Sequence, residues 1–191
     1  MWCGLSKRFG SIAVNLSGER LYLRPLTLED ASGPYPSWFN DPEVCRYNSH
    51  GEKVYTRKMA EAYIREAQKD PTKEVFAIVD RKEHGHVGNI ALQRIDRRNR
   101  QAELAIILGE KKVWGRGFGY EAVRILLGYG FTALQLHRVY CGTTADNLPM
   151  IVLAERIGMR KEGILKEAMY RDGTFVDVIL FGILEHEFSS M

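Results

Sequence analysis

Apolar and polar residues along the chain follow two periodicities, which predict the order of its elements. Alternation over about four to eight residues predicts strands, which we place at residues 21–26, 74–80, 86–96, 101–108, 137–143, 164–171 and 174–184. Apolar residues three and four apart predict helices, which we place at residues 57–68, 120–134 and 147–157. A further helix is expected to start near Leu28, and residues 38–44 are typical of a short helix and turn.

Capping and turn residues mark where several of these elements begin and end. Thr27 and Asp30 have the spacing of a capping box, and Thr56 is placed to cap the next helix. Gly158 stands where a left-handed helix cap is expected, and Asp172-Gly173 is a strong hairpin signal. Short connections between three successive strands predict an antiparallel meander, and the strand, helix and strand that follow imply a parallel crossover. The predicted fold class is α/β with a mixed sheet.

Length and composition indicate one globular domain. The chain has 191 residues, of which 45% are hydrophobic and 27% charged, and this is enough for a substantial core. We expect the domain to span residues 21–188, with residues 1–20 as an N-terminal extension. No apolar run reaches the roughly 18 residues of a membrane span, and no signal peptide is apparent. We therefore expect a cytoplasmic protein without a membrane partner.

Charge and cysteine content bear on two further classes of protein. The net charge is only +3, and most basic residues are interspersed with acidic ones, so we expect no nucleic-acid partner. The basic cluster at residues 94–100 is the partial exception. Cys3, Cys45 and Cys141 form no C-x-x-C pair, which favours a reducing compartment and argues against a metal site.

The clearest chemical signal is a glycine-rich stretch between a strand and a helix, made of Trp114, Gly115, Arg116, Gly117, Phe118 and Gly119. Glycines let a backbone approach a ligand closely, and the first amides of a helix lie unpaired at the positive end of its dipole. These features form a cradle for a pyrophosphate. Tyr120 occupies the third glycine position of a dinucleotide fingerprint, and the sequence has no Gly-Lys-Ser or Gly-Lys-Thr of a Walker loop.

This stretch resembles the acetyl-coenzyme A loop of GNAT-fold N-acetyltransferases, because Gly117 and Gly119 match its two small positions. Residues 114–122 are similar to the variant found in the ribosomal-protein-alanine acetyltransferase branch. The resemblance covers residues 21–188 and includes local patterns at residues 38–44, 87–90, 102–104, 136–139, 147–159, 162–165 and 172–177. It implies the GNAT fold, a mixed and mostly antiparallel central sheet with flanking helices, in which strands 4 and 5 form a splayed parallel pair.

The same resemblance implies transfer of an acetyl group from acetyl-coenzyme A to a primary amine in a ternary complex, without a metal. The pantetheine arm would enter the splay and pair with backbone groups near Ile107, Leu108 and Gly109. Asn147 would hydrogen-bond near the arm. The pyrophosphate would be held by loop amides, with added charge from the arginine, at Trp114, Gly115, Arg116, Gly117, Phe118, Gly119 and Tyr120.

Glu103 is the candidate general base, because it matches the position where this branch often carries one. The amine must lose a proton before it attacks. The alternative for Glu103 is a hairpin carboxylate that faces Arg98 or Arg100. No general acid is identified, because Ala154 and Met150 occupy the positions where relatives place Tyr and Ser. A bound water could protonate the thiolate, or it could leave unassisted.

Acceptor contacts are expected from the region 33–55 and from the later hairpin, at Tyr35, Trp38, Asn48, His50 and Tyr170. His50 could act as a second base or as a hydrogen-bonding residue, and Trp38 could instead be a core anchor. The acceptor is either a protein N-terminal amine or a small molecule such as a nucleotide-linked aminosugar. The sequence has no acidic cluster of the kind expected for a polyamine.

Two other classes of function stay open at this stage. A catalytically weak acyl-coenzyme A-binding module would keep the cradle without turnover, and the retention of Glu103 argues against it. A dinucleotide-dependent oxidoreductase conflicts with Tyr120. The sequence is compatible with a monomer and with a homodimer.

Overall fold

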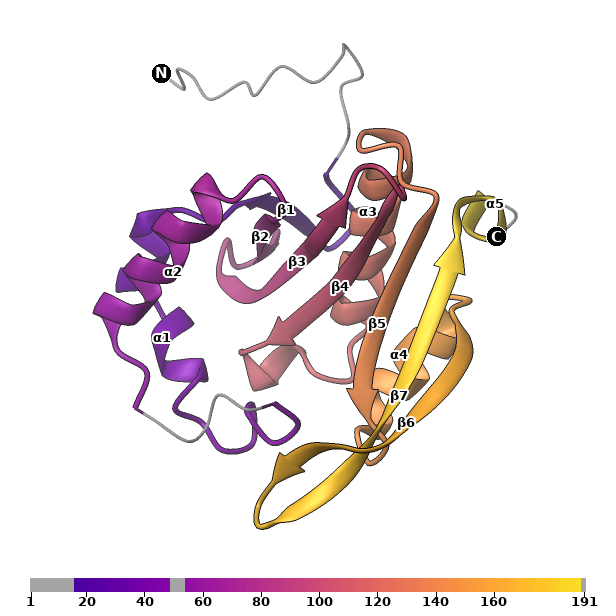
Figure 1. The fold of residues 1–191 in the computed structure, drawn as a ribbon. Helices are drawn as coiled ribbons and strands as arrows, with labels where there is room; N and C mark the ends of the chain where they lie inside the picture. Colours follow the sequence, from indigo (N-terminus) through magenta and orange to yellow (C-terminus); the bar gives the residue numbers. More distant parts are fainter. Residues whose placement is uncertain (1–15, 49–53, 190–191) are drawn as a thin grey trace.

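The computed structural model describes residues 16–48 and 54–189, and its centre is a seven-stranded sheet with the order β1-β2-β3-β4-β5-β7-β6 (Figure 1). The strands are β1 (Leu21–Pro25), β2 (Glu74–Asp80), β3 (His86–Asp96), β4 (Gln101–Leu108), β5 (Arg138–Thr144), β6 (Arg160–Arg171) and β7 (Thr174–Leu184). The helices are η1 (Leu28–Ser32), α1 (Tyr35–Trp38), α2 (Arg57–Lys69), η3 (Lys111–Val113), α3 (Phe118–Thr132), α4 (Leu148–Arg156) and α5 (Glu185–Ser189). The predicted α/β class with a mixed sheet is confirmed.

The parallel contact in the middle of the sheet is short. β4 runs antiparallel to β3 and parallel to β5, and the parallel register comprises Gln101↔Arg138, Ala102↔Val139 and Glu103↔Tyr140. In the described ranges, no residue pair joins the two strands beyond these. Figure 1 shows β4 and β5 diverging toward their carboxyl ends. The expected splay of a parallel pair is therefore present.

Two apolar clusters cover the two faces of the sheet. The larger includes residues of α3 and α4, and the smaller includes residues of η1, α1 and α2. Side chains alternate between faces along a strand. Leu104 and Ile106 of β4 therefore pack in or against the larger cluster, and Ile107 packs against the smaller one. Glu103 precedes Ile107 by an even number of residues, so its side chain lies on the same face of the sheet as Ile107, the face covered by α1 and α2.

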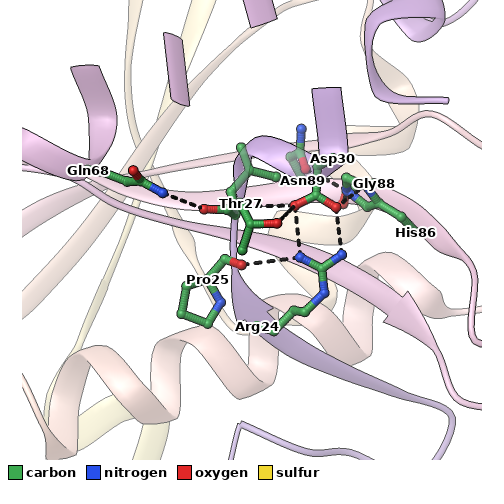
Figure 2. Close-up of polar contacts among 9 residues, drawn as sticks. Arg24, Pro25, Thr27, Asp30, Gln68, His86, Gly88 and Asn89 are labelled. Carbon is green, nitrogen blue, oxygen red and sulfur yellow. Dashed lines mark hydrogen bonds and ion pairs between the residues drawn. The ribbon is translucent and has the colours of Figure 1, made fainter. Parts of the chain in front are cut away.

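A largely buried polar cluster joins β1, η1 and β3 (Figure 2). The Arg24 guanidinium donates to both carboxylate oxygens of Asp30, at 2.6 and 2.8 Å, and the Thr27 amide donates to Oδ2 at 2.8 Å. His86 Nδ1 lies 3.3 Å from Asp30 Oδ1, and its Nε2 lies 2.8 Å from Asn89 Oδ1. Burial alone would raise the pKa of Asp30, but the hydrogen bonds from Arg24, together with the nearby His86 ring, outweigh it and hold that pKa far below the usual range.

Most element boundaries agree with the sequence prediction. β2, β3, β4 and β7 have the predicted bounds, and β1 and β5 differ from them by one residue at one or both ends. The capping box at Thr27 is formed, and the Thr56 side chain accepts from the Met59 amide. Gly158 adopts a φ of 88°, and Asp172 and Gly173 have positive φ in the hairpin.

Two elements were predicted wrongly. The helix expected within residues 38–44 instead spans Tyr35–Trp38, with Pro34 as its N-cap and Pro36 in its first turn. Proline has a φ that suits a helix's first turn, so Pro34 and Pro36 begin a helix here. β6 starts at Arg160 rather than at residue 164. Its first residues are polar and lie on an edge strand, so they show no apolar alternation.

Candidate active site

The glycine-rich loop has the backbone of an anion cradle. Gly115 and Gly117 adopt φ values of 69° and 80°, where residues other than glycine are strained. Gly117 is the N-cap of α3, and the first intrahelical bond runs from the Glu121 amide to the Gly117 carbonyl at 3.1 Å. The amides of Phe118, Gly119 and Tyr120 precede that bond, at the positive end of the helix dipole. This arrangement can bind a diphosphate.

Side chains of the loop hold its shape. The Trp114 indole donates to the Leu108 carbonyl at 2.9 Å, which ties the loop to the end of β4. Arg116 Nη1 donates to the Lys112 carbonyl at 3.3 Å, and the Arg116 guanidinium lies 5.9 Å from the Phe118 ring centroid. We expect the pantetheine arm to pair near Leu108. The carbonyl oxygen of Leu108 already accepts one hydrogen bond from the chain itself.

Tyr120, which replaces the glycine of a dinucleotide fingerprint, stacks with two arginines. The Arg156 guanidinium lies 4.4 Å from the Tyr120 ring centroid and the Arg124 guanidinium lies 5.9 Å from it. Arg156 therefore contacts a loop residue as well as solvent. The ring joins α3 to α4 beside the cradle.

Trp38 links α1 to the end of β4. Its indole donates to Glu110 Oε1 at 3.0 Å and lies directly on the backbone of Gly109, where a Cβ would come within 1.9 Å of the ring. Only glycine fits there without displacing Trp38. The amides of Gly109 and Glu110 both donate to the Val87 carbonyl, at 3.0 and 3.1 Å. The start of the loop is therefore fixed from two sides.

Two residues expected to contact the acceptor lie in the core. Tyr35 is 2% exposed and Trp38 is 3% exposed, and the Tyr35 hydroxyl lies 3.3 Å from that of Tyr55. Burial, with this contact, raises the pKa of Tyr35 above its usual range. Their burial favours packing behind the site for both rings, and the expected contact of either ring with the acceptor stays a prediction.

Glu103 occupies the last residue pair before β4 and β5 separate. Its side chain is 20% exposed, and Oε2 lies 3.2 Å from Gln93 Nε2 and 3.4 Å from Arg94 Nε. The expected neighbours Arg98 and Arg100 are not the ones that bind it; Arg100 donates to the Gln135 carbonyl at 2.6 Å. A carboxylate at this point can accept a proton from a group that lies in the splay.

Asn147 caps α4 at the end of β5. Its Oδ1 accepts from the Met150 amide at 3.3 Å, and its Nδ2 donates to Thr143 Oγ1 at 2.9 Å. The side chain thus has a structural role in addition to the predicted contact with the pantetheine arm. Ala154 is buried, and Met150 packs against the larger apolar cluster.

A groove of about 810 Å³ lies between the chain that follows α1 and the β6–β7 hairpin. Asn48 and Tyr170, two of the predicted acceptor contacts, are among its lining residues, whereas His50 lies outside the described residues. Its charged lining residues are two carboxylates and two guanidiniums: Asp41, Asp172, Arg46 and Arg171. Tyr170 is 60% exposed, so its ring is accessible to a ligand in the groove.

One residue of the site, Arg20, had no signal in the sequence analysis, and the contacts of Arg171, which lies in the expected hairpin, were not predicted. Arg20, just before β1, binds Glu121 in the first turn of α3 with a distance of 2.7 Å. Arg171 forms an ion pair with Asp146 and donates to Thr144 Oγ1 at 3.3 Å, and so fixes the hairpin to the end of β5. The partners are 101 and 25 residues apart, so no local pattern connects them.

The described residues contain no group of three metal-ligating side chains. Among them, no helix is long and apolar enough to span a bilayer.

Comparison with known families decides the assignment. Residues 20–160 match the acetyltransferase (GNAT) domain family. The chain belongs to the GNAT family. It is an acetyl-coenzyme A-dependent N-acetyltransferase, and the GNAT fold expected from the glycine loop is confirmed.

Individual relatives agree with this assignment. The uncharacterized N-acetyltransferase p20 of Bacillus licheniformis is 33% identical over 174 residues, covering 90% of this chain and 96% of the relative. Spermidine N(1)-acetyltransferase of Vibrio cholerae is 28% identical over 151 residues, covering 79% of this chain and 80% of the relative. A crystal structure of the Vibrio cholerae spermidine N-acetyltransferase with CoA and spermine has a TM-score of 0.80 and 26% identity, covering 89% of this chain and 98% of that one.

Proposed function

We propose that this GNAT enzyme acetylates the primary amine of a protein N-terminus or of a small molecule such as a nucleotide-linked aminosugar, by direct attack in a ternary complex. The observation that carries the proposal is the position of Glu103. Its carboxylate lies at the point where the parallel strands separate, on the sheet face of α1 and α2. An acyl group carried into the splay from the glycine loop approaches this point.

Glu103 supplies the base that the chemistry needs. An alkyl ammonium has a pKa of about 10 and no lone pair, so the carboxylate takes its proton directly or through a water. The amine nitrogen then bonds to the acetyl carbon, the carbon–sulfur bond breaks, and the electron pair leaves with the thiolate of coenzyme A. That thiolate is a stable leaving group, since a free thiol has a pKa of about 8.5, and it takes up, through a water, the second proton that the nitrogen loses as the amide forms. Ala154 and Met150 have no proton to give.

The groove supports an acceptor other than a polyamine. A polyamine carries several positive charges, and a site for it needs an excess of carboxylates. Among the described residues that line the groove, the charged groups are balanced, with Asp41 and Asp172 against Arg46 and Arg171. Lys111 forms ion pairs with Asp41 at 2.8 Å and with the neighbouring Glu43 at 2.6 Å, so its charge is shared between these two carboxylates. A peptide end or a phosphorylated sugar is compatible with this mixed lining.

A polyamine acceptor is the second candidate, and it is favoured by the similarity to spermidine N-acetyltransferases. The measurement that separates the candidates is coenzyme A release from acetyl-coenzyme A with four groups of amines. These are peptides with free N-termini, nucleotide-linked aminosugars, spermidine with spermine, and aminoglycosides. Mass spectrometry then identifies the acetylated nitrogen.

We expect turnover with a peptide or aminosugar and a rate with spermidine that is lower by about an order of magnitude or more. Preferred turnover of spermidine would refute the acceptor assignment but not the acetyltransferase activity. Tight binding of acetyl-coenzyme A without turnover of any amine in a wider panel would favour a binding module and contradict the proposed function.

A further inference from the structure

Arg20 connects the start of the described chain to the glycine loop. Its Nε donates to Glu121 Oε2 at 2.7 Å, its Nη1 donates to the Arg116 carbonyl, and its Nη2 donates to the Gly117 carbonyl at 3.4 Å. Its backbone amide donates to Glu121 Oε1 at 2.8 Å. All three nitrogens of one guanidinium therefore face the cradle from behind.

These bonds determine which way two peptide groups of the loop point. In a planar trans peptide, the carbonyl of one residue and the amide of the next point in opposite directions. Because Arg20 holds the carbonyls of Arg116 and Gly117, the amides of Gly117 and Phe118 point away from it. Both amides precede the first intrahelical bond of α3. Arg20 thus leaves N–H groups, and not carbonyl oxygens, facing a ligand in the cradle.

Glu121 is the second part of the arrangement. A carboxylate in the first turn of a helix stabilises the helix dipole, but it also repels a diphosphate bound at the same helix end. The Glu121 side chain is only 13% exposed. Burial alone would raise its pKa, and hydrogen bonds from the backbone and side chain of Arg20 outweigh this and lower it. The carboxylate therefore stays ionised, with Arg20 as its counter-ion.

Close packing keeps this pair in place. A Cβ on Gly18 would lie 2.3 Å from Glu121 Oε1, and a Cβ on Gly117 would lie 3.1 Å from Arg20 Nη2. The Arg20 guanidinium also lies 5.7 Å from the Phe118 ring centroid. The chain before β1 is therefore part of the back wall of the loop.

We propose that Arg20 is a positioning residue for the diphosphate of the acyl donor: it orients the amides of Gly117 and Phe118 and neutralises Glu121. The inference rests on the glycine loop as the diphosphate site, which belongs to the proposed function. It does not depend on which amine is the acceptor.

The test measures binding of coenzyme A and of pantetheine, which lacks the diphosphate and the nucleotide, by calorimetry without acceptor. We expect Arg20→Gln to weaken coenzyme A binding about tenfold or more, as for loss of charge-assisted hydrogen bonds, and to leave pantetheine binding within about twofold. Arg20→Lys keeps the charge but not the planar fork, and we expect an intermediate loss. Arg160→Gln, which removes a different exposed ion pair, with Glu187 at 3.1 Å, is the control and should bind both ligands as the wild type does.

A double variant separates the orienting role of Arg20 from its charge. In Arg20→Gln, the Glu121 carboxylate has lost its counter-ion and repels the diphosphate. Adding Glu121→Gln removes that carboxylate, so the double variant should recover part of the coenzyme A affinity that Arg20→Gln loses. Thermal melting of each variant shows whether it is folded; if Arg20→Gln does not fold, Arg20→Lys carries the same comparison. Equal loss of coenzyme A and pantetheine binding, or unchanged coenzyme A affinity, would overturn the proposal. Failure to find an acceptor would leave these binding results unaffected.

Discussion

Strands β3 and β6 have 11 and 12 residues and opposite surroundings. β3 lies between β2 and β4, and most of its side chains are buried. β6 is the edge of the sheet, with β7 as its neighbour, and most of its side chains are exposed. We refer to β1 to β4 with η1, α1 and α2 as the packed half, and to β5 to β7 as the open half. The groove takes one wall from the β6–β7 hairpin of the open half and the other from the chain that follows α1.

This difference indicates how the two ligands are accommodated. The packed half fixes the end of β4 through Trp38 and Gly109, and thus fixes the start of the loop for the acyl donor. The open half presents the β6–β7 hairpin, which Arg171 fixes to the end of β5 and on which Tyr170 is 60% exposed. Substitutions in the packed half should therefore change stability, and substitutions at the hairpin should change acceptor use.

The largest effect is expected at Asp30, in the packed half. Asp30→Asn leaves the partly buried Arg24 guanidinium, whose side chain is 27% exposed, without its counter-ion; breaking a fully buried pair costs about 3–5 kcal/mol, and we expect a loss toward the lower end of that range. Urea unfolding at neutral pH measures the loss. A change as small as that of a surface substitution would contradict the importance of the packed half.

The same pair predicts a dependence on pH. The pKa of Asp30 is lower in the folded protein than in the unfolded chain, so its contribution is complete above the unfolded pKa of about 3.9. It is lost as the pH falls from there toward the folded pKa. The stability difference between wild type and Asp30→Asn should be constant from pH 7 to about pH 5 and shrink below about pH 4. A difference that grows on acidification would have the wrong sign.

Glu103 lies at the boundary of the two halves and gives the next effect. Glu103→Gln keeps the shape of the side chain but cannot accept the proton, so kcat should fall about a hundredfold. The KM for acetyl-coenzyme A should stay within about threefold, because the cradle is untouched. Glu162→Gln, which alters a carboxylate paired with Arg138 in the open half, is the matched control. Wild-type turnover by Glu103→Gln would remove the assignment of the base.

A smaller effect is expected at the hairpin. Tyr170→Ala removes an exposed ring from the groove, and the loss of one aromatic contact corresponds to about 0.5–1.5 kcal/mol, or roughly two- to tenfold in acceptor KM. Coenzyme A binding should not change. Phe175, whose ring centroid is 5.0 Å from that of Tyr170, does not line the groove, so Phe175→Ala is the comparison. Equal effects of both variants would indicate that the ring pair acts through hairpin structure.

The smallest effect on stability is expected at Lys166, which forms an ion pair with Asp177 in the open half. Its Nζ lies 2.8 Å from Asp177 Oδ2, and its side chain is 77% exposed. Exposed pairs of this kind contribute little because water and salt screen them. Lys166→Ala should have the urea midpoint of the wild type. A decrease that approaches that of Asp30→Asn would erase the distinction between the halves.

The packed half was the easier to predict from sequence. β2, β3 and β4 have the predicted bounds; β2 and β3 are mostly buried runs, and such runs stand out in a sequence when turn residues bound them. β6 carries charged residues on an exposed edge, so its first four residues were not predicted to belong to a strand. Tyr35 and Trp38 were expected near substrate because aromatic residues serve packing and recognition equally well, and only their burial separates the two roles.

The site itself divides in the same manner. The glycine loop could be predicted because its glycines and the following helix are adjacent in sequence. The part played by Arg20 could not, since the residue acts on carbonyls and a carboxylate about a hundred residues away. The acceptor groove is formed by segments about 120 residues apart, and the chemistry of such a surface depends on how they meet in the fold.

The short pairing of β4 with β5 links the lifetime of the protein to the supply of its substrate. After Glu103 and Tyr140 the strands separate, and a donor bound in the splay would pair with backbone that the folded chain leaves to water. A ligand that binds only the folded state stabilises it by mass action, by about 1.4 kcal/mol for each tenfold rise in free ligand above its dissociation constant. Chains in a cell short of acetyl-coenzyme A would then open more often and meet proteases sooner than chains in a well-supplied cell.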